Sequence, residues 1–222
     1  MKKKIKNYVN KIHKSTKRDY FARMANSKVK CMKEARKFEK NFFDGDRKYG
    51  YGGHYYIKDY WKSVAKKLIK DYDLKENSSV LDVGCGKGYL LYEIKKINPK
   101  INVAGFDISK YAIKNAHPEI KKYLFNHNAK NKFKFKTNKF DLTISLATLH
   151  NLKIYNIIDS LKEIKRVSKK QYIMVESYRS EQELFNLQCW ALTCESFLDT
   201  KEWEWSFRLA EYTGDYEFIF MS

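Results

Sequence analysis

Glycines and acids at the ends of apolar runs are the residues of this chain best suited to hold a ligand. One apolar run ends directly before Gly84, Gly86 and Gly88. A strand followed by a glycine turn and a helix lets backbone amides approach a bound molecule closely, because no side chain stands in the way. The next apolar run, 101–106, ends in Asp107, whose carboxylate is placed to accept hydrogen bonds from the hydroxyls of a ribose.

Two titratable side chains follow later predicted strands and are the candidates for acid–base chemistry. His150 comes shortly after the strand predicted at 140–145, and its ordinary pKa lies near the working pH. Glu176 directly follows the strand predicted at 172–175. Each residue also has a structural alternative. His150 could begin a helix without a catalytic role, and Glu176 could form an ion pair or a helix cap. We predict a catalytic role for His150 first and for Glu176 second.

The glycine turn and the acid after it resemble a known family. Val-Leu-Asp-Val-Gly-Cys-Gly-Lys-Gly (80–88) and Val-Ala-Gly-Phe-Asp-Ile-Ser (103–109) look like the first two motifs of class I S-adenosylmethionine (SAM) methyltransferases. The glycine spacing G-x-G-x-G differs from the G-x-G-x-x-G of dinucleotide-binding folds. The resemblance runs from about Trp61 to the C-terminus, and its first motif is specific. It implies an enzyme with SAM as its cofactor.

The family resemblance also implies a cofactor site. The glycines make room for the methionine half of SAM, Asp107 holds the ribose, and Ile108 packs on the adenine. After the third strand the family usually has an acid and a small residue, whereas this sequence has Asn128 and Ala129. The Asn128 oxygen can still accept a hydrogen bond from the adenine amine. The predicted cofactor-binding residues are Asp82, Gly84, Cys85, Gly86, Gly88, Asp107, Ile108, Asn128, Ala129 and Leu146.

Apolar runs alternate with amphipathic stripes and predict an α/β fold with a doubly wound, mostly parallel sheet of the seven-stranded type. We expect a methyltransferase domain over 57–222, preceded by a helical extension over 1–56. The family normally closes its sheet with an antiparallel hairpin, but only one clear strand stands at this end, so the last strand is in doubt. The expected strands are 79–83, 101–106, 123–125, 140–145, 172–175 and 216–220.

The N-terminal extension is predicted to carry a lid. Residues 1–14 read as a basic arm or a frayed helix, and 16–40 as one or two amphipathic helices. The block 44–56 holds four of the nine glycines and four tyrosines, a composition that suits a loop closing over a ligand. An ordinary packed loop is the alternative. The predicted substrate-binding residues are Arg47, Tyr49, Tyr51, Tyr55 and Tyr178.

Composition restricts the class of protein. With 222 residues, 43% of them hydrophobic, the chain is long enough for one domain with a real core plus extensions. It has no run of 18 apolar residues, and the basic N-terminus lacks the apolar segment of a signal peptide, so we expect no membrane span and a cytoplasmic protein. Cys31, Cys85, Cys189 and Cys194 match no zinc or C-x-x-C spacing, and we predict neither a metal site nor a disulfide.

The net charge of +19 is unevenly distributed. Residues 1–40 hold 15 Lys and Arg against 3 acids, whereas residues 171–222 hold 3 against 10. A basic front half suits nucleic acid, an anionic membrane surface or a phosphorylated small substrate. The alternative is compositional, because the chain is rich in Lys, Asn and Ile, as an AT-rich coding sequence would give.

Three functions are compatible with these features. The first is a small-molecule methyltransferase that acts on an oxygen, or less readily a nitrogen, of a phosphorylated or nucleotide-linked acceptor. The block 44–56 resembles that of a bacterial subgroup associated with surface polysaccharides such as capsule, which favours a sugar or phosphoramidate precursor. The second is an RNA methyltransferase whose basic N-terminal arm holds phosphates. The third is a SAM-site protein without methylation activity, either an aminopropyltransferase-like enzyme or a regulator.

Overall fold

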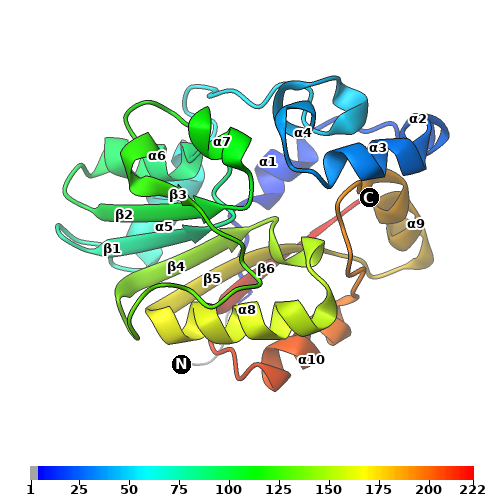
Figure 1. Ribbon diagram of the computed structural model, residues 1–222. Helices are drawn as coiled ribbons and strands as arrows, with labels where there is room; N and C mark the ends of the chain where they lie inside the picture. Colours follow the sequence, from blue (N-terminus) through cyan, green and yellow to red (C-terminus); the bar gives the residue numbers. More distant parts are fainter. Residues whose placement is uncertain (1–4) are drawn as a thin grey trace.

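The computed structural model describes residues 5–222 and is built around one sheet (Figure 1). Within these residues the sheet has six strands in the order β3-β2-β1-β4-β5-β6, and every neighbouring pair is parallel. The expected α/β fold is confirmed. The strands are β1 (Ser79–Val83), β2 (Asn102–Asp107), β3 (Leu124–Asn126), β4 (Phe140–Leu146), β5 (Ser168–Ser177) and β6 (Asp215–Phe220).

The closing edge of the sheet differs from the usual hairpin of the family. β6 pairs directly with β5, with Tyr172 opposite Asp215 and Ser177 opposite Phe220. No antiparallel strand lies between them in the described chain. The doubt about the last strand is thereby resolved, because the sheet of residues 5–222 has six strands rather than seven.

Both faces of the sheet are buried, which is why its strands read as nearly continuous apolar runs. Successive residues of β1 point into two separate cores. The first core is closed by α5 (Lys62–Asp71) and α6 (Tyr89–Ile97), and the second by α8 (Ile154–Val167) and α10 (Thr200–Leu209). This double cover leaves the carboxyl ends of the strands as the edge at which a ligand can bind.

Backbone geometry sets where two of these helices begin. α5 begins only at Lys62, because Asp59 has a φ of +62° that interrupts the helical backbone before it. α10 is capped by Asp199. The Asp199 carboxylate accepts from the Glu202 amide, and the Glu202 carboxylate accepts from the Asp199 amide, which is a capping box.

The first described residues are attached to the sheet. Ile5 forms a parallel bridge with Tyr216 of β6, and α1 (Asn10–Lys14) follows. The carboxylate of Glu217, fully buried in β6, accepts hydrogen bonds from three backbone amides at the start of α1 and from the Tyr172 hydroxyl. The expectation of a loose arm is therefore wrong for its described part, and its first four residues lie outside the described chain.

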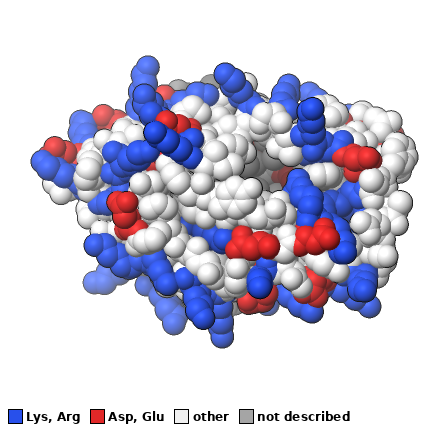
Figure 2. Space-filling model, turned by 90° about the horizontal axis from the view of Figure 1, so that it is seen from above, with Lys and Arg blue, Asp and Glu red and all other residues white. Residues whose placement is uncertain are grey.

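Short helices of the N-terminal extension cover the carboxyl edge of the sheet (Figure 1). They lie against α7 (Lys110–Lys114) and α9 (Glu181–Trp190). From above, Lys and Arg side chains crowd the rim of the molecule, and the middle is mostly uncharged (Figure 2). In residues 5–222 no helix has the length and apolarity needed to cross a membrane. The covering elements are α2 (Tyr20–Ala25), α3 (Lys28–Ala35), α4 (Lys40–Asp44) and the 3₁₀ turn η1 (Arg47–Tyr49).

Candidate active site

The glycine turn between β1 and α6 is held by backbone hydrogen bonds. The amides of Gly84 and Cys85 donate to the carbonyl of Phe106 on β2, at 2.8 and 3.0 Å. The backbone angle φ is +79° at Gly84 and +54° at Gly86, a region that other residues rarely adopt. A methyl group built on Gly84 would lie 2.0 Å from Thr148 Oγ1, whereas one on Gly86 would meet nothing nearer than 3.7 Å. The turn therefore needs glycine at Gly84 for packing, whereas a methyl group at Gly86 would make ordinary contacts with His54 and Phe43.

Two buried acids stand beside this turn. Asp107 at the end of β2 accepts hydrogen bonds from the amides of Gly86 and Ser109, both at 2.8 Å. Asp82 in β1 is 5% exposed, and its carboxylate makes no hydrogen bond or ion pair within residues 5–222. Burial, and then the nearby Asp107 carboxylate, raise the pKa of Asp82 to about 8. A buried acid without a partner favours a positively charged ligand at this position.

The residues expected around an adenine lie next to Asp107. Ile108 keeps 46% of its surface exposed although it directly follows β2, so an apolar face is available there. Asn126 fixes this corner, because its side-chain amide donates to the carbonyls of Asp107 and Ile108 at 2.9 and 2.7 Å. Asn128 accepts a hydrogen bond from the Lys130 amide at 3.1 Å and keeps a second lone pair for a ligand. The sequence reading missed Asn126, although a polar residue at the end of a strand was the available signal.

The other predicted cofactor residues form the walls of the site. Burial raises the pKa of the Cys85 thiol well above its usual value, so this side chain stays neutral. A methyl group on Gly88 would lie 2.7 Å from the Leu124 side chain. Ala129 is buried, and its carbonyl accepts from the hydroxyl of a serine on α8 at 2.8 Å. Leu146, at the end of β4, is half-buried and packs against the first core.

The chain turns sharply after β4. Ala147 has a φ of +54°, which is a strained conformation for a residue with a side chain. Its amide donates to the carbonyl of Met174 on β5 at 2.9 Å, and the His150 carbonyl accepts from the amides of Glu195 and Ser196. These hydrogen bonds hold the 3₁₀ turn η3 (Leu149–Asn151) beside β5, so that His150 reaches the end of that strand.

His150 and Glu176 meet at the carboxyl ends of β4 and β5. His150 Nε2 lies 3.4 Å from Glu176 Oε2, and the Glu176 amide donates to His150 Nδ1 at 3.3 Å. Since an amide only donates, Nδ1 is the acceptor, and the neutral ring carries its proton on Nε2, facing the carboxylate. Burial lowers the pKa of His150 and outweighs the raising effect of Glu176, so the ring is neutral near pH 7. This arrangement leaves Glu176, rather than His150, able to accept a proton.

The lid loop, residues 44–56, touches the glycine turn. Asp44 accepts hydrogen bonds from Lys87 Nζ and from the Tyr111 hydroxyl, both at 2.7 Å, and from the His54 amide at 3.0 Å. The His54 ring lies over Gly86, with Nε2 3.7 Å from the position of a methyl group there. Burial lowers the pKa of His54 to about 4. The sequence reading missed these lid contacts, and its available signal was that Asp44 and His54 flank the glycines and tyrosines.

Two of the predicted substrate-binding residues lie together near the acids. Tyr51 is 46% exposed, yet burial, then Asp107 and then Glu176 raise the pKa of its hydroxyl to about 12. Part of the Tyr51 side chain is therefore open to solvent on the side of the molecule that holds these two acids. Arg47 Nη1 donates to the Tyr51 carbonyl at 3.1 Å, so both residues belong to one turn of the lid loop.

The other three predicted substrate-binding residues point elsewhere. Tyr49 packs beside a small cluster that includes Leu192. Tyr55 is 67% exposed. Tyr178 lies near the acids that begin α9 and α10. Its burial and then the charge of Glu202 therefore raise the pKa of its hydroxyl. The structure therefore places Arg47 and Tyr51 in one turn near the acids, whereas these three tyrosines have other surroundings.

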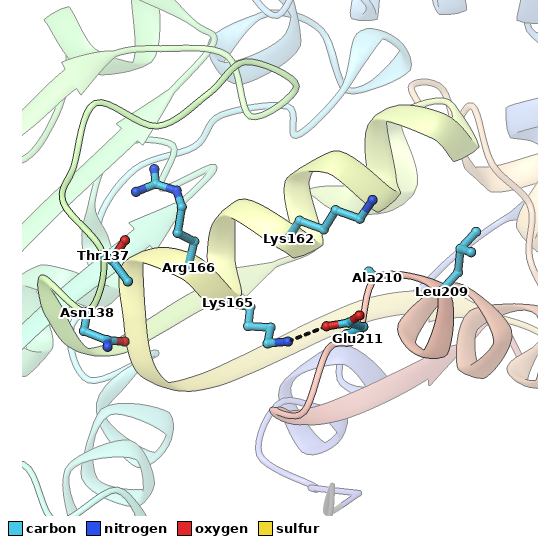
Figure 3. A pocket seen from close by; sticks show the side chains of 8 residues that line it. All are labelled: Thr137, Asn138, Lys162, Lys165, Arg166, Leu209, Ala210 and Glu211. Atoms are coloured by element: carbon cyan, nitrogen blue, oxygen red, sulfur yellow. Dashed lines mark hydrogen bonds and ion pairs between the residues drawn. The ribbon is translucent and has the colours of Figure 1, made fainter.

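A surface hollow lies at the opposite edge of the sheet (Figure 3). Asn138 precedes β4 and Arg166 precedes β5, each by two residues, so the hollow is at the amino ends of the strands. Lys165 and Glu211 pair beside it at 3.1 Å. It is separate from the glycine turn. Its lining residues are Thr137, Asn138, Lys162, Lys165, Arg166, Leu209, Ala210 and Glu211.

Comparison with known proteins accounts for the glycine turn and its acids. A family model described as a methyltransferase domain matches residues 74–211, more than half of the chain. The chain belongs to this methyltransferase family. The resemblance to class I SAM-dependent methyltransferases is thereby confirmed, together with the enzyme class and with SAM as the cofactor of the family.

Individual relatives of this methyltransferase are distant. A putative methyltransferase from Bacillus halodurans C-125 has a TM-score of 0.54 and 20% identity, over 67% of this chain and 68% of that one. A geranyl diphosphate methyltransferase in complex with GPP and sinefungin has a TM-score of 0.52 and 11% identity, over 66% and 57%. These two show the fold alone. A tRNA U34 carboxymethyltransferase of Nautilia profundicola is 42% identical over 55 residues, which is 24% of this chain and only 18% of that protein.

Proposed function

We propose that this chain transfers a methyl group from SAM to an oxygen of a small, phosphorylated or nucleotide-linked acceptor. The observation that carries the proposal is the contact of His150 with Glu176 at the carboxyl edge of the sheet. A hydroxyl nucleophile needs a base, and this contact supplies an oriented carboxylate. A nitrogen acceptor depends less on a base and is the second choice. The surface-polysaccharide context and the cytoplasmic location predicted from the sequence stay part of this proposal.

The cofactor site of the proposal consists of groups that suit SAM. Gly86 leaves room for the methionine half, Asp107 accepts from the ribose hydroxyls, and the exposed face of Ile108 packs on the adenine. Asp82 lies unpaired beside them and would face the positive charge that SAM carries. When bound, SAM supplies a methyl group on a sulfonium, which already contains its leaving group.

In the proposed reaction the protein's own residues remove one proton, that of the acceptor hydroxyl. Glu176 takes the proton of the acceptor hydroxyl as the oxygen attacks. His150 Nε2 lies 3.4 Å from the carboxylate, so His150 is a positioning residue, and Trp203 Nε1 donates to the Glu176 carbonyl at 3.1 Å. Tyr51 and the lid loop exclude water from the cleft, which keeps the nucleophile in line with the methyl group. The proposal thus reverses the order predicted from the sequence, because Glu176 comes before His150.

The test begins with S-adenosylhomocysteine (SAH) binding to the full chain by calorimetry. Transfer from labelled SAM is then measured against phosphorylated sugars, nucleotide-linked sugars and RNA. Glu176→Gln should lower kcat by about 10²–10⁴-fold without changing the affinity for SAH. His150→Asn should lower kcat less and keep the acidic limb of the pH–rate profile. Loss of that limb in His150→Asn alone would identify His150 as the base and contradict the assignment.

RNA methylation is the second candidate, and one observation favours it. The 55 residues shared with a tRNA U34 carboxymethyltransferase lie in a chain of net charge +19. The described part of the N-terminal arm packs against β6, which removes one reason for this function. Binding of RNA at 150 mM salt that is no tighter than binding of other polyanions would exclude it.

A further inference from the structure

Three arginines gather around one tryptophan beside the proposed active site. The guanidinium carbons of Arg18, Arg23 and Arg47 lie 5.5, 4.5 and 5.1 Å from the ring centre of Trp190. The arginines come from the residues before α2, from α2 itself and from η1, and Trp190 ends α9. Packing of the N-terminal extension on α9 therefore assembles the cluster, and only Arg47 was predicted from the sequence.

No acid neutralises these arginines within residues 5–222. They form no ion pair there, and their hydrogen bonds go to backbone carbonyls and to His13. Burial, and then the charge of Arg47, lower the pKa of Arg23 to about 10. Burial and Arg23 likewise lower the pKa of the nearby Lys28 to about 8. Partly buried cations that form no ion pair favour an anion among them.

The donors that remain free identify which arginines would contact such an anion. Arg23 uses its terminal nitrogens on three carbonyls of η1 and the residue after it, so it holds the lid loop. Arg18 Nε is buried and has no hydrogen-bond partner in the described chain. Arg47 donates through Nη1 only, which leaves Nε and Nη2 available.

The cluster adjoins the site of methyl transfer. The charges of Glu176 and Arg47 both act on the pKa of Arg18. Tyr51 lies within electrostatic reach of Asp107, Glu176 and Arg47 together. Arg47 Nη1 also donates to the Tyr51 carbonyl at 3.1 Å, so Tyr51 links the arginines to the side of the molecule that holds Asp107 and Glu176.

We propose that Arg18 and Arg47 bind the phosphate of a small phosphorylated acceptor and direct its hydroxyl toward Glu176, with Arg23 holding the lid loop in place. This inference rests on the proposed function and names its substrate class. Charge decides between anions, because a carboxylate offers one negative charge to three guanidinium groups, whereas a phosphomonoester carries about −1.5 to −2 and a diphosphate more. The planar guanidinium fork also matches phosphate oxygens two at a time.

The test measures inorganic pyrophosphate binding by calorimetry to the full chain saturated with SAH, at constant ionic strength. Arg18→Ala and Arg47→Ala should each weaken pyrophosphate binding about tenfold or more, and acetate should bind less tightly than pyrophosphate. Arg47→Lys keeps the charge but loses the fork, and its loss should be intermediate. The matched control is Arg208→Ala, an exposed arginine on α10, which should bind pyrophosphate like the wild type.

The outcomes separate this inference from the function on which it rests. Absent pyrophosphate binding in a protein that binds SAH, or an equal loss in Arg208→Ala, overturns the phosphate site and leaves the methyltransferase proposal intact. Absent SAH binding contradicts the proposed function itself. A short RNA that displaces pyrophosphate at far lower concentration and depends on Arg47 would replace the small acceptor by RNA. If Arg18→Ala does not fold, pyrophosphate binding by the variants of the exposed Arg47 tests the phosphate site alone.

Discussion

Asp82 and Glu176 are carboxyl groups at the same edge of one sheet, yet their surroundings give them different chemistry. Asp82 is buried without a partner, and its pKa of about 8 keeps it largely protonated at neutral pH. Glu176 is partly exposed, and its carboxylate lies 3.4 Å from His150 Nε2. Environments that separate two acids in this way assign them different roles. Here we assign cofactor binding to the first and proton transfer to the second.

Asp82 should make the ligand-free protein less stable as pH rises. Its folded-state pKa lies above the unfolded value, so the folded protein holds an extra proton between about pH 4 and 8, and stability falls through that window. Asp82→Asn should therefore be more stable than the wild type at pH 8.5 by roughly 1–3 kcal/mol, while its affinity for SAM falls. Thermal unfolding between pH 5 and 9 measures the difference.

The control for this experiment is Asp159→Asn, an exposed acid on α8. Its unfolding curves should follow those of the wild type at every pH. If the Asp82 variant and the wild type also show the same pH dependence, Asp82 is not protonated in the folded protein and the argument fails.

At the scale of elements, the lid loop and the glycine turn form one unit. The lid is anchored by Asp44 to Lys87 in the turn and to Tyr111 on α7, and its His54 ring covers Gly86. The lid thus occupies the space next to the cradle in which the proposed cofactor lies. Closure and cofactor binding should therefore influence each other, because both depend on the same few ångströms above Gly86.

Filling the cradle should abolish cofactor binding without unfolding the protein. Asn tolerates the left-handed backbone better than other non-glycine residues, so Gly86→Asn keeps the turn but places a side chain against His54. We expect SAH affinity to fall by about 100-fold, the scale of a 1 Å misplacement in a site, with a stability loss of about 1 kcal/mol. Calorimetry and thermal unfolding test the two parts. Unchanged SAH affinity would show that the ligand lies elsewhere.

At the scale of the whole molecule, the two ends of the described chain stabilise each other. Glu217 of β6 accepts hydrogen bonds from the amides of Tyr8, Val9 and Asn10, more than 200 residues away in the sequence. The same carboxylate accepts from the Tyr172 hydroxyl. Residues 8–10 are therefore attached to the core beside β6, although the composition of this segment suggests a solvated arm.

Removing this charge should cost much of the stability of the domain. Glu217→Gln keeps the size of the side chain but presents an amide, with its own donors, to four donating groups. We expect a loss of about 2–4 kcal/mol in urea unfolding. Glu211→Gln is the matched control, since Glu211 pairs with Lys165 at the surface and should cost about 0–1 kcal/mol. Equal losses of stability in the two variants would show that the buried Glu217 contacts stabilise the fold no more than a surface ion pair does.

Local patterns along the chain were enough to predict the sheet, the glycine turn and the family. Apolar runs predict the buried strands. The three glycines within residues 84–88 predict a turn, because each adopts a positive φ there. Asp107 is found for the same reason, because a strand end fixes where its last side chain lies. All these signals are local, and burial on both faces of the sheet makes them strong.

Only the folded arrangement shows which of the reactive groups is proposed as the base and which as the positioning residue. The sequence proposed both His150 and Glu176, but only the Glu176 amide on Nδ1 assigns the imidazole proton to Nε2, the nitrogen 3.4 Å from the carboxylate. Arg18 and Arg23 join Arg47 only because α2 packs on α9, about 165 residues later in the chain. Contacts of this length depend on how whole elements pack, and no local pattern of apolar residues, glycines or charges encodes which side chains will face one another across them.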